Sequence, residues 1–122
     1  MIIFLTKLIT KVMNLLGYGA TTLPGRIALF FKRDILAKLS QGVKVIVITG
    51  TNGKTTTSNL IADAVAASGA TVVCNRAGNN MEPGVVGALL EARGGLKHTA
   101  SGKRVGVFEC DELYTVRVLP KL

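Results

Sequence analysis

Residues 43–56 read VKVIVITGTNGKTT, and this segment is the strongest indication of the fold class. Its first seven residues are rich in β-branched side chains and almost continuously apolar, which is typical of a strand in a buried parallel sheet. A glycine-containing loop follows at residues 50–57, and residues 58–68 then predict a helix that stops at Gly69. Residues 70–75 (ATVVCN) predict a second strand. This order of elements indicates a βαβ unit and therefore an α/β fold.

The loop after the first predicted strand has the features of a phosphate-binding loop. Gly50 and Gly53 allow the main chain to approach an oxygen-rich ligand, and backbone N–H groups at the start of the next helix can point at phosphate. Lys54 is placed to reach the β- and γ-phosphates, and Thr55 to put its hydroxyl on Mg²⁺. The common pattern G-x-x-x-x-G-K-[ST] would have its first glycine at Ile48, so the loop is a shortened variant. The alternative is a glycine turn with a solvated lysine.

A third strand is predicted at residues 104–108, and acidic residues follow it directly. Acids at the end of such a strand, beside a phosphate loop, commonly hold Mg²⁺, and Glu109 is the first candidate. Asp111 and Glu112 are equally well explained as residues that cap the next helical turn. Cys110 is most simply a small apolar residue.

A polar loop at residues 76–84 leaves the end of the second strand, which in a parallel sheet faces the ligand crevice. Asn79 and Asn80 either hydrogen-bond a phosphate or substrate there, or only form the turn. Residues 85–92 predict a short helix. His98 stands in the glycine-containing loop that follows, and the sequence assigns it no role.

Residues 1–40 predict a helical lead-in, with an amphipathic helix at 2–16 and a second helix at about 26–39. The first helix is shorter than a membrane span and carries two central lysines, which disfavours insertion. A signal peptide is disfavoured because the charges lie inside the apolar run. The helix either lies on a membrane surface or packs on protein.

Composition narrows the class of protein further. The chain has 122 residues, 48% of them apolar, so it is one domain or part of one and must bury a core. Its net charge is +8, and residues 1–40 hold six Lys/Arg and one Asp, which favours an anionic membrane surface. Nucleic acid is disfavoured because the charges are otherwise scattered and aromatics are few. Cys74 and Cys110 lack metal-ligand or disulfide-framework spacing, which fits a reducing cytoplasm.

Residues 50–56 (GTNGKTT) resemble the ATP loop of the Mur ligases, enzymes that form amide bonds through an acyl phosphate. Flanking motifs are similar to the Mur-ligase-like subunits of lipid II isoglutaminyl synthases. They are residues 23–28 (LPGRIA), 75–81 (NRAGNNM), 109–112 (ECDE) and 118–120 (VLP). The resemblance implies that residues 41–122 form part of a Mur-ligase-type central domain, with about three mainly parallel strands.

The resemblance also implies the cofactors ATP and Mg²⁺. The nucleotide contacts it implies are Gly50, Thr51, Asn52, Gly53, Lys54, Thr55, Thr56 and Asn80. Thr55 and Glu109 match the metal-binding positions of the family. Zinc, further catalytic residues and the surface that docks the partner are expected beyond Leu122, since family members are much longer. The 122-residue chain is therefore expected to be inactive alone, and marginally stable.

The activity implied by the resemblance is ATP-dependent amidation of the D-glutamate α-carboxyl of lipid II in cell-wall synthesis. A glutamine amidotransferase subunit of the GatD type would form a heterodimer with the chain and supply ammonia. The implied location is the cytoplasm. An extension of this prediction is peripheral attachment to the inner face of the plasma membrane. Alternatives are another Mur-type ligase (amino-acid-adding or folylpolyglutamate-like), a non-catalytic nucleotide-binding module at a membrane, or a remnant without activity.

Overall fold

The computed structural model describes residues 4, 8, 11–12, 15, 22–75, 80–95 and 102–122. Its regular elements are α2 (Leu23–Phe31), α3 (Ile35–Leu39), β1 (Val43–Ile48), α4 (Lys54–Ala67), β2 (Thr71–Cys74), α5 (Glu82–Gly95), β3 (Arg104–Glu109), α6 (Glu112–Val118) and a 3₁₀ turn, η1 (Leu119–Lys121). Phe4, Leu8, Lys11, Val12 and Leu15 are helical, and the rest of the predicted helix 2–16 lies outside the described residues. So does His98.

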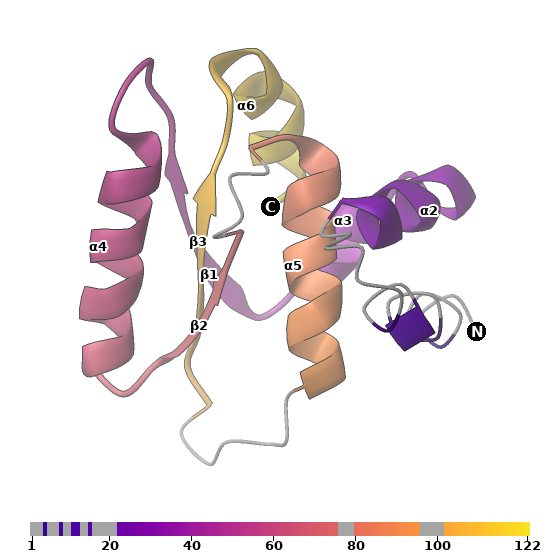
Figure 1. Cartoon of the computed structure of the whole chain (residues 1–122), viewed down its shortest axis with the longest axis horizontal. Coiled ribbons are helices and arrows are strands. Elements are labelled where there is room, and N and C mark those ends of the chain that lie inside the picture. The colour runs from indigo at the N-terminus through magenta and orange to yellow at the C-terminus, as the bar shows by residue number, and fades with distance from the viewer. Residues whose placement is uncertain are drawn as a thin grey trace.

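The three strands form one parallel sheet in the order β1-β3-β2 (Figure 1). The register runs from Val43 opposite Arg104 to Ile48 opposite Glu109 on one side of β3. The strand that comes last in the sequence is therefore the central strand. The predicted α/β fold with three parallel strands is confirmed. Because the strands are parallel, their carboxyl ends meet at one edge of the sheet.

Helices cover the two faces of this sheet (Figure 1). Helix α4 lies on one face and α5 on the other, while α2 and α3 pack beyond α5. The buried apolar cluster on the α5 side contains Phe108 of β3, Val85 and Val86 of α5, and Leu36 of α3. Residues 106–109 of β3 are all buried, as the central position of that strand requires.

The predicted helix at 26–39 is wrong, because the structure contains two helices there. Helix α2 ends at Phe31, and Lys32 takes an extended conformation with φ −150° and ψ 100° before α3 begins at Ile35. The apolar spacing continues across this break, so hydrophobic periodicity alone does not reveal it. Helix α2 also begins earlier than predicted, with Pro24 in its first turn, where the missing N–H costs no hydrogen bond.

Two other helices are longer than predicted. Helix α4 begins at Lys54 rather than at residue 58, directly after the loop glycine Gly53. Helix α5 runs over Glu82–Gly95 rather than 85–92, with Pro83 again in the first turn. The added residues of both helices are polar or rich in glycine, so they contribute little to the hydrophobic periodicity from which helix ends are predicted.

Helices α2 and α5 are in backbone contact. Pro24, Gly25 and Ala28 form the buried face of α2. A Cβ atom at Gly25 would lie 1.9 Å from the carbonyl oxygen of Pro83, so only glycine fits between the two helices. Among the described residues, no helix is both long enough and apolar enough to cross a membrane.

Candidate nucleotide-binding site

The loop between β1 and α4 has the conformation that its glycines permit. Gly50 has φ 143° and Gly53 has φ 76°, both in the region that favours glycine. A Cβ atom at either position would meet nothing within 4 Å, so backbone conformation rather than space requires the glycines. The first helical hydrogen bond of α4 runs from the Thr57 N–H to the Gly53 carbonyl oxygen, at 2.9 Å.

That geometry leaves the N–H groups of the first turn of α4 at the mouth of the loop. They precede the first helical hydrogen bond and have no acceptor within the helix. A helix N-terminus of this kind attracts anions through its N–H groups and its dipole. Thr51, Asn52 and Thr56 are exposed on the same loop and first turn. The arrangement is therefore suited to binding phosphate oxygens.

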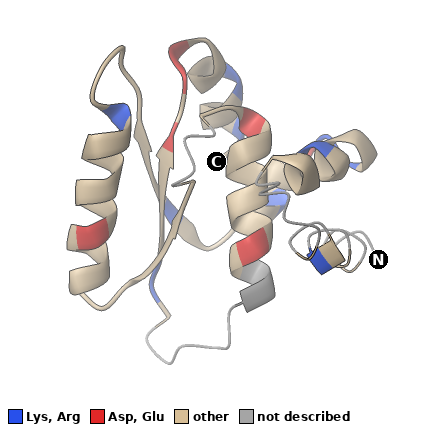
Figure 2. Cartoon of the chain, viewed as in Figure 1, with Lys and Arg blue, Asp and Glu red and all other residues tan. Residues whose placement is uncertain are grey.

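Lys54 is the first residue of α4, and its side chain folds back over the loop. Its Nζ donates a hydrogen bond to the carbonyl oxygen of Gly50. The ammonium group is thus held at the loop mouth, partly buried and close to the N-terminus of α4. In Figure 2 the basic position at this end of α4 and the acidic positions at the end of β3 and the start of α6 lie at the same end of the sheet.

Thr55 and Glu109, the two predicted metal ligands, are in direct contact. Thr55 Oγ1 donates a hydrogen bond of 2.9 Å to Glu109 Oε2, although the residues are 54 positions apart. The contact joins the first turn of α4 to the carboxyl end of β3. A hydroxyl and a carboxylate are the hard oxygen ligands that Mg²⁺ prefers.

Thr55 and Glu109 offer a divalent cation one hydroxyl and one carboxylate. Within the described ranges, no three His, Cys, Asp or Glu residues cluster as a metal site. Mg²⁺ commonly takes one or two carboxylates from the protein and completes its shell with phosphate oxygens and water. Thr55 and Glu109 fit that small protein share.

Asn75, to which the sequence analysis assigned no role, holds Glu109 from the other side. Asn75 Nδ2 donates to the Glu109 carbonyl oxygen at 2.8 Å, and Glu109 N donates to Asn75 Oδ1 at 2.9 Å. Both residues are buried, at 7% and 5% exposure. The position of Asn75 at the end of a predicted strand was the available signal, but the pairing depends on strand register.

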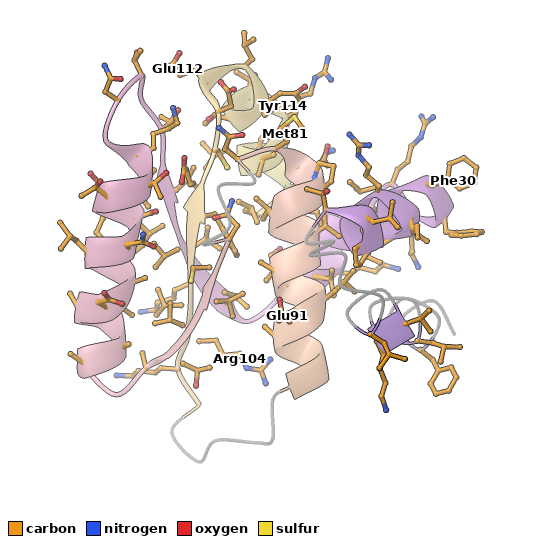
Figure 3. All side chains as sticks on the ribbon, in the orientation of Figure 1. Phe30, Met81, Glu91, Arg104, Glu112 and Tyr114 are labelled. Carbon is orange, nitrogen blue, oxygen red and sulfur yellow. The ribbon has the colours of Figure 1, made fainter. Side chains whose placement is uncertain are left out.

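The other polar candidates lie around this centre. Asn80 contributes its backbone carbonyl, which accepts a hydrogen bond of 2.8 Å from Asp111 N. Asp111 is the N-cap residue of α6 but makes no side-chain capping bond. Glu112 Oε1 accepts from Thr51 Oγ1 at 3.1 Å, linking the loop to α6, and Figure 3 shows Glu112 at this end of the sheet. Asn79 lies outside the described residues.

Cys110 follows Glu109 but is not suited to nucleophilic chemistry. Its side chain is completely buried, and this burial, together with the nearby Glu109 charge, raises the pKa of its thiol to about 11. The reactive form of cysteine is the thiolate, so the group is inert near neutral pH. The structure contains no disulfide bond between Cys110 and Cys74.

A separate groove of about 530 Å³ runs along β1 on the α6 side of the sheet. Its lining residues are Val43, Val45, Val47, Thr49, Thr115, Leu119 and Leu122. None of the predicted nucleotide or metal contacts lines it. The groove is therefore not the candidate site.

The fold and the site define a small α/β protein whose glycine loop and acidic residue meet at the carboxyl edge of a parallel sheet. Comparison with curated proteins gives the more particular likeness. The chain is 40% identical over 121 residues to the lipid II isoglutaminyl synthase (glutamine-hydrolyzing) subunit MurT of Staphylococcus aureus, in strains COL and N315. It is 38% identical over 107 residues to the MurT subunit of Streptococcus pneumoniae.

The match covers 88–98% of this chain but only 23–26% of the MurT subunits. The chain thus spans about a quarter of the length of the curated relatives it matches, and it fits a piece of a MurT-type protein. No protein-family model matches the chain. The resemblance indicated by the sequence motifs is confirmed, and the activity of a whole synthase is a separate question.

Proposed function

We propose that this chain is the ATP-binding part of a lipid II isoglutaminyl synthase subunit. The observation that carries the proposal is the hydrogen bond from Thr55 to Glu109, because it brings the phosphate loop and the acidic strand end together. The likeness to MurT subunits, whose names state a glutamine-hydrolysing lipid II isoglutaminyl synthase, supports the substrate and the reaction.

In this proposal the loop residues Gly50–Thr56 surround the phosphates of ATP. Backbone N–H groups of the first turn of α4 donate to phosphate oxygens, and Lys54 exchanges its hydrogen bond with the Gly50 carbonyl for the β- and γ-phosphates. Thr55 and Glu109 would hold Mg²⁺, and Asn80 lies at the same edge. The bound metal would supply charge neutralisation on the phosphate oxygens.

The chemistry that these residues would serve is activation of a carboxylate. A carboxylate is a poor electrophile, and transfer of the γ-phosphoryl group to the D-glutamate α-carboxyl of lipid II gives it a leaving group. Lys54 offsets negative charge that develops on the transferring group. Ammonia then attacks the acyl carbon, and inorganic phosphate leaves as the amide forms. This is peptidoglycan synthesis, with the remaining catalytic residues and any zinc site expected in the larger part of the protein.

Ammonia would come from a glutamine amidotransferase subunit of the GatD type, paired with this protein as a heterodimer. The relatives' names support this, since each is called a subunit and glutamine-hydrolyzing. The location that follows is the cytoplasmic face of the plasma membrane, where a lipid-linked precursor can be reached.

Binding of Mg²⁺–ATP to the chain tests the nucleotide part of the proposal. Lys54→Ala should weaken binding by about 10- to 100-fold, since hydrogen bonds to charged groups contribute about 1.5–3 kcal/mol. Lys44→Ala, at an exposed lysine of β1, is the matched control and should bind normally. Equal affinity of the Lys54→Ala variant and the unaltered chain, measured by calorimetry, would overturn the assignment of the loop.

The reaction itself is tested in the complete synthase. Lipid II, ATP and glutamine should give isoglutamine-containing lipid II, and ammonium salts should replace glutamine when the amidotransferase is left out. Addition of an amino acid in place of ammonia would instead support another Mur-type ligase. ATP binding without any amide formation would support a non-catalytic nucleotide-binding module.

A further inference from the structure

Helix α2 carries large exposed apolar residues outside the face that it buries. Pro24, Gly25 and Ala28 form the face that is buried. At 100° per residue, Leu23, Phe30 and the basic Arg26 lie opposite that face, and Ile27 and Phe31 lie on the flank between. A surface helix normally turns its apolar residues toward the core and its polar residues toward solvent. The outer face of α2, which comprises Leu23, Arg26, Ile27, Phe30 and Phe31, departs from this pattern because three of its apolar residues are exposed.

The two phenylalanines of this face are the clearest sign of an unpartnered surface. Phe30 is 85% exposed and Phe31 is 59% exposed. Their rings contact each other edge to face, with centroids 5.6 Å apart. Figure 3 shows Phe30 at the outer end of α2, pointing away from the sheet. Large apolar side chains that are adjacent and this exposed commonly mark a surface that contacts a membrane or another protein.

Basic residues stand near the exposed phenylalanines in the sequence. Residues 22–40 contain Arg26, Lys32, Arg33 and Lys38, against Asp34 as the single acid. Asp34 is paired with Lys38 at 3.6 Å. The pKa of Lys32 is lowered from its ordinary value because its ammonium group interacts with that of Lys38. Residues 22–40 thus carry an excess of positive charge, which attracts anionic phosphate groups.

The described residues nearer the N-terminus also combine exposed apolar side chains with positive charge. Phe4, Leu8, Val12 and Leu15 are helical, are exposed, and recur at a spacing of three or four residues. Lys11 is exposed beside them. This spacing places them on one helical face. The described part of the first 40 residues thus holds two exposed apolar surfaces, each accompanied by positive charge.

We propose that α2 docks on the surface of an anionic lipid bilayer. Leu23, Ile27, Phe30 and Phe31 would enter the boundary between headgroups and acyl chains, while the basic residues contact lipid phosphates. The excess of positive charge around α2 favours an anionic bilayer as the partner of this surface. The exposed apolar residues of α6, Leu113 and Val116, follow Asp111 and Glu112, so that helix lacks the excess of positive charge that an anionic bilayer attracts.

This inference goes beyond the proposed ligase chemistry, and lipid binding can be measured without it. The chain is mixed with phosphatidylcholine vesicles, with or without phosphatidylglycerol, and bound protein is separated by flotation. Binding should require phosphatidylglycerol and should fall as salt is raised, because salt screens surface charges. The Lys54→Ala variant should float like the unaltered chain, so failure of the nucleotide site and failure of lipid docking are distinguishable.

Substitutions at exposed positions distinguish the apolar contribution to vesicle binding from the electrostatic contribution. Phe30→Ser with Phe31→Ser should reduce partitioning at least about tenfold, since burial of each phenylalanine is lost. Arg26→Gln and Arg33→Gln should each reduce it about fivefold. The matched controls on α6 are Leu113→Ser with Val116→Ser, and Arg117→Gln, at similarly exposed positions. These should bind as the unaltered chain does.

Two outcomes would overturn the proposal. One is equal binding to vesicles with and without phosphatidylglycerol at every salt concentration. The other is the absence of binding to vesicles of either composition, for which self-association that the Phe30→Ser with Phe31→Ser variant abolishes would give the reason. That second result would assign the outer face of α2 to contact between copies or with another protein segment.

Discussion

The side-chain amide of Asn75 pairs with the backbone of Glu109 through two hydrogen bonds, of 2.8 and 2.9 Å. The last backbone pair between β2 and β3 is Cys74 with Val107. The amide of Asn75 thus takes the place of a peptide group just beyond the end of β2. It fixes the main chain of Glu109 and leaves the carboxylate of Glu109 directed to Thr55.

Asn75→Asp should destabilise the chain by about 1–3 kcal/mol, because a carboxylate oxygen replaces the Nδ2 donor opposite the Glu109 carbonyl. Urea unfolding followed by circular dichroism measures the change. Asn59→Asp, at a half-buried position on α4, is the control and should change stability by less than about 0.5 kcal/mol. Similar losses in both variants would mean that the Asn75 pairing is not special.

Thr55→Val removes the hydroxyl that bonds Glu109 but keeps the shape of the side chain. We expect Mg²⁺-dependent ATP affinity to fall by about tenfold or more, since a buried carboxylate then loses a charge-assisted hydrogen bond. Thr55→Ser should retain most of the affinity. Thr57→Val, at an exposed position of the same helix, should have no effect. Titration of ATP with and without Mg²⁺ distinguishes a metal role from a purely structural one.

Gly25→Ala should lower stability, by about 1–3 kcal/mol, because the added methyl group would overlap the Pro83 carbonyl oxygen. Helix propensity alone predicts the opposite sign, with alanine favoured by about 1 kcal/mol over glycine. The sign of the change in the free energy of unfolding therefore decides between close helix packing and propensity. An unchanged or increased midpoint of urea unfolding would contradict the α2–α5 contact.

The raised thiol pKa of Cys110 makes stability depend on pH in the alkaline range. The unfolded thiol ionises near its ordinary pKa of 9.0, whereas the folded thiol keeps its proton until about pH 11. Between these values the folded state binds more protons, so stability should fall as pH rises, by about 1.4 kcal/mol per pH unit. Below pH 9 this contribution is fully present.

Lysines also titrate in this range, so the effect of Cys110 must be isolated by difference. Cys110→Ala should unfold with a shallower dependence on pH between 9 and 11 than the unaltered chain, in magnesium-free buffer. Identical slopes for the two proteins would show that the buried thiol does not keep its proton.

The sequence predicts the parts of the fold that depend on local pattern. The apolar run of β1 and the loop glycines Gly50 and Gly53 indicate both the strand and the turn, and the structure contains both. The meeting of Thr55 with Glu109 follows from placing a phosphate loop and an acid at the same sheet edge. Their binding of a metal stays a prediction.

The parts that the sequence does not reveal depend on long-range geometry. The break between Phe31 and Ile35 interrupts an apolar pattern that continues in the sequence, and it follows from the extended backbone at Lys32. The role of Asn75 depends on the register of β2 against β3. The tight approach at Gly25 depends on how α2 crosses α5, which local pattern does not encode.

The central place of β3 has a consequence for how the chain folds. Both β1 and β2 hydrogen-bond only to β3 in the described sheet. Val43 of β1 therefore cannot pair until Arg104 of β3 has been synthesised. During synthesis, the loop and α4 emerge well before any strand pair can close. Pairing between strands this far apart in the sequence is slow, because the entropy cost of closing the loop is incurred before the stabilising contacts form. Glu109 arrives with β3, so formation of the sheet and assembly of the Thr55–Glu109 contact are one event.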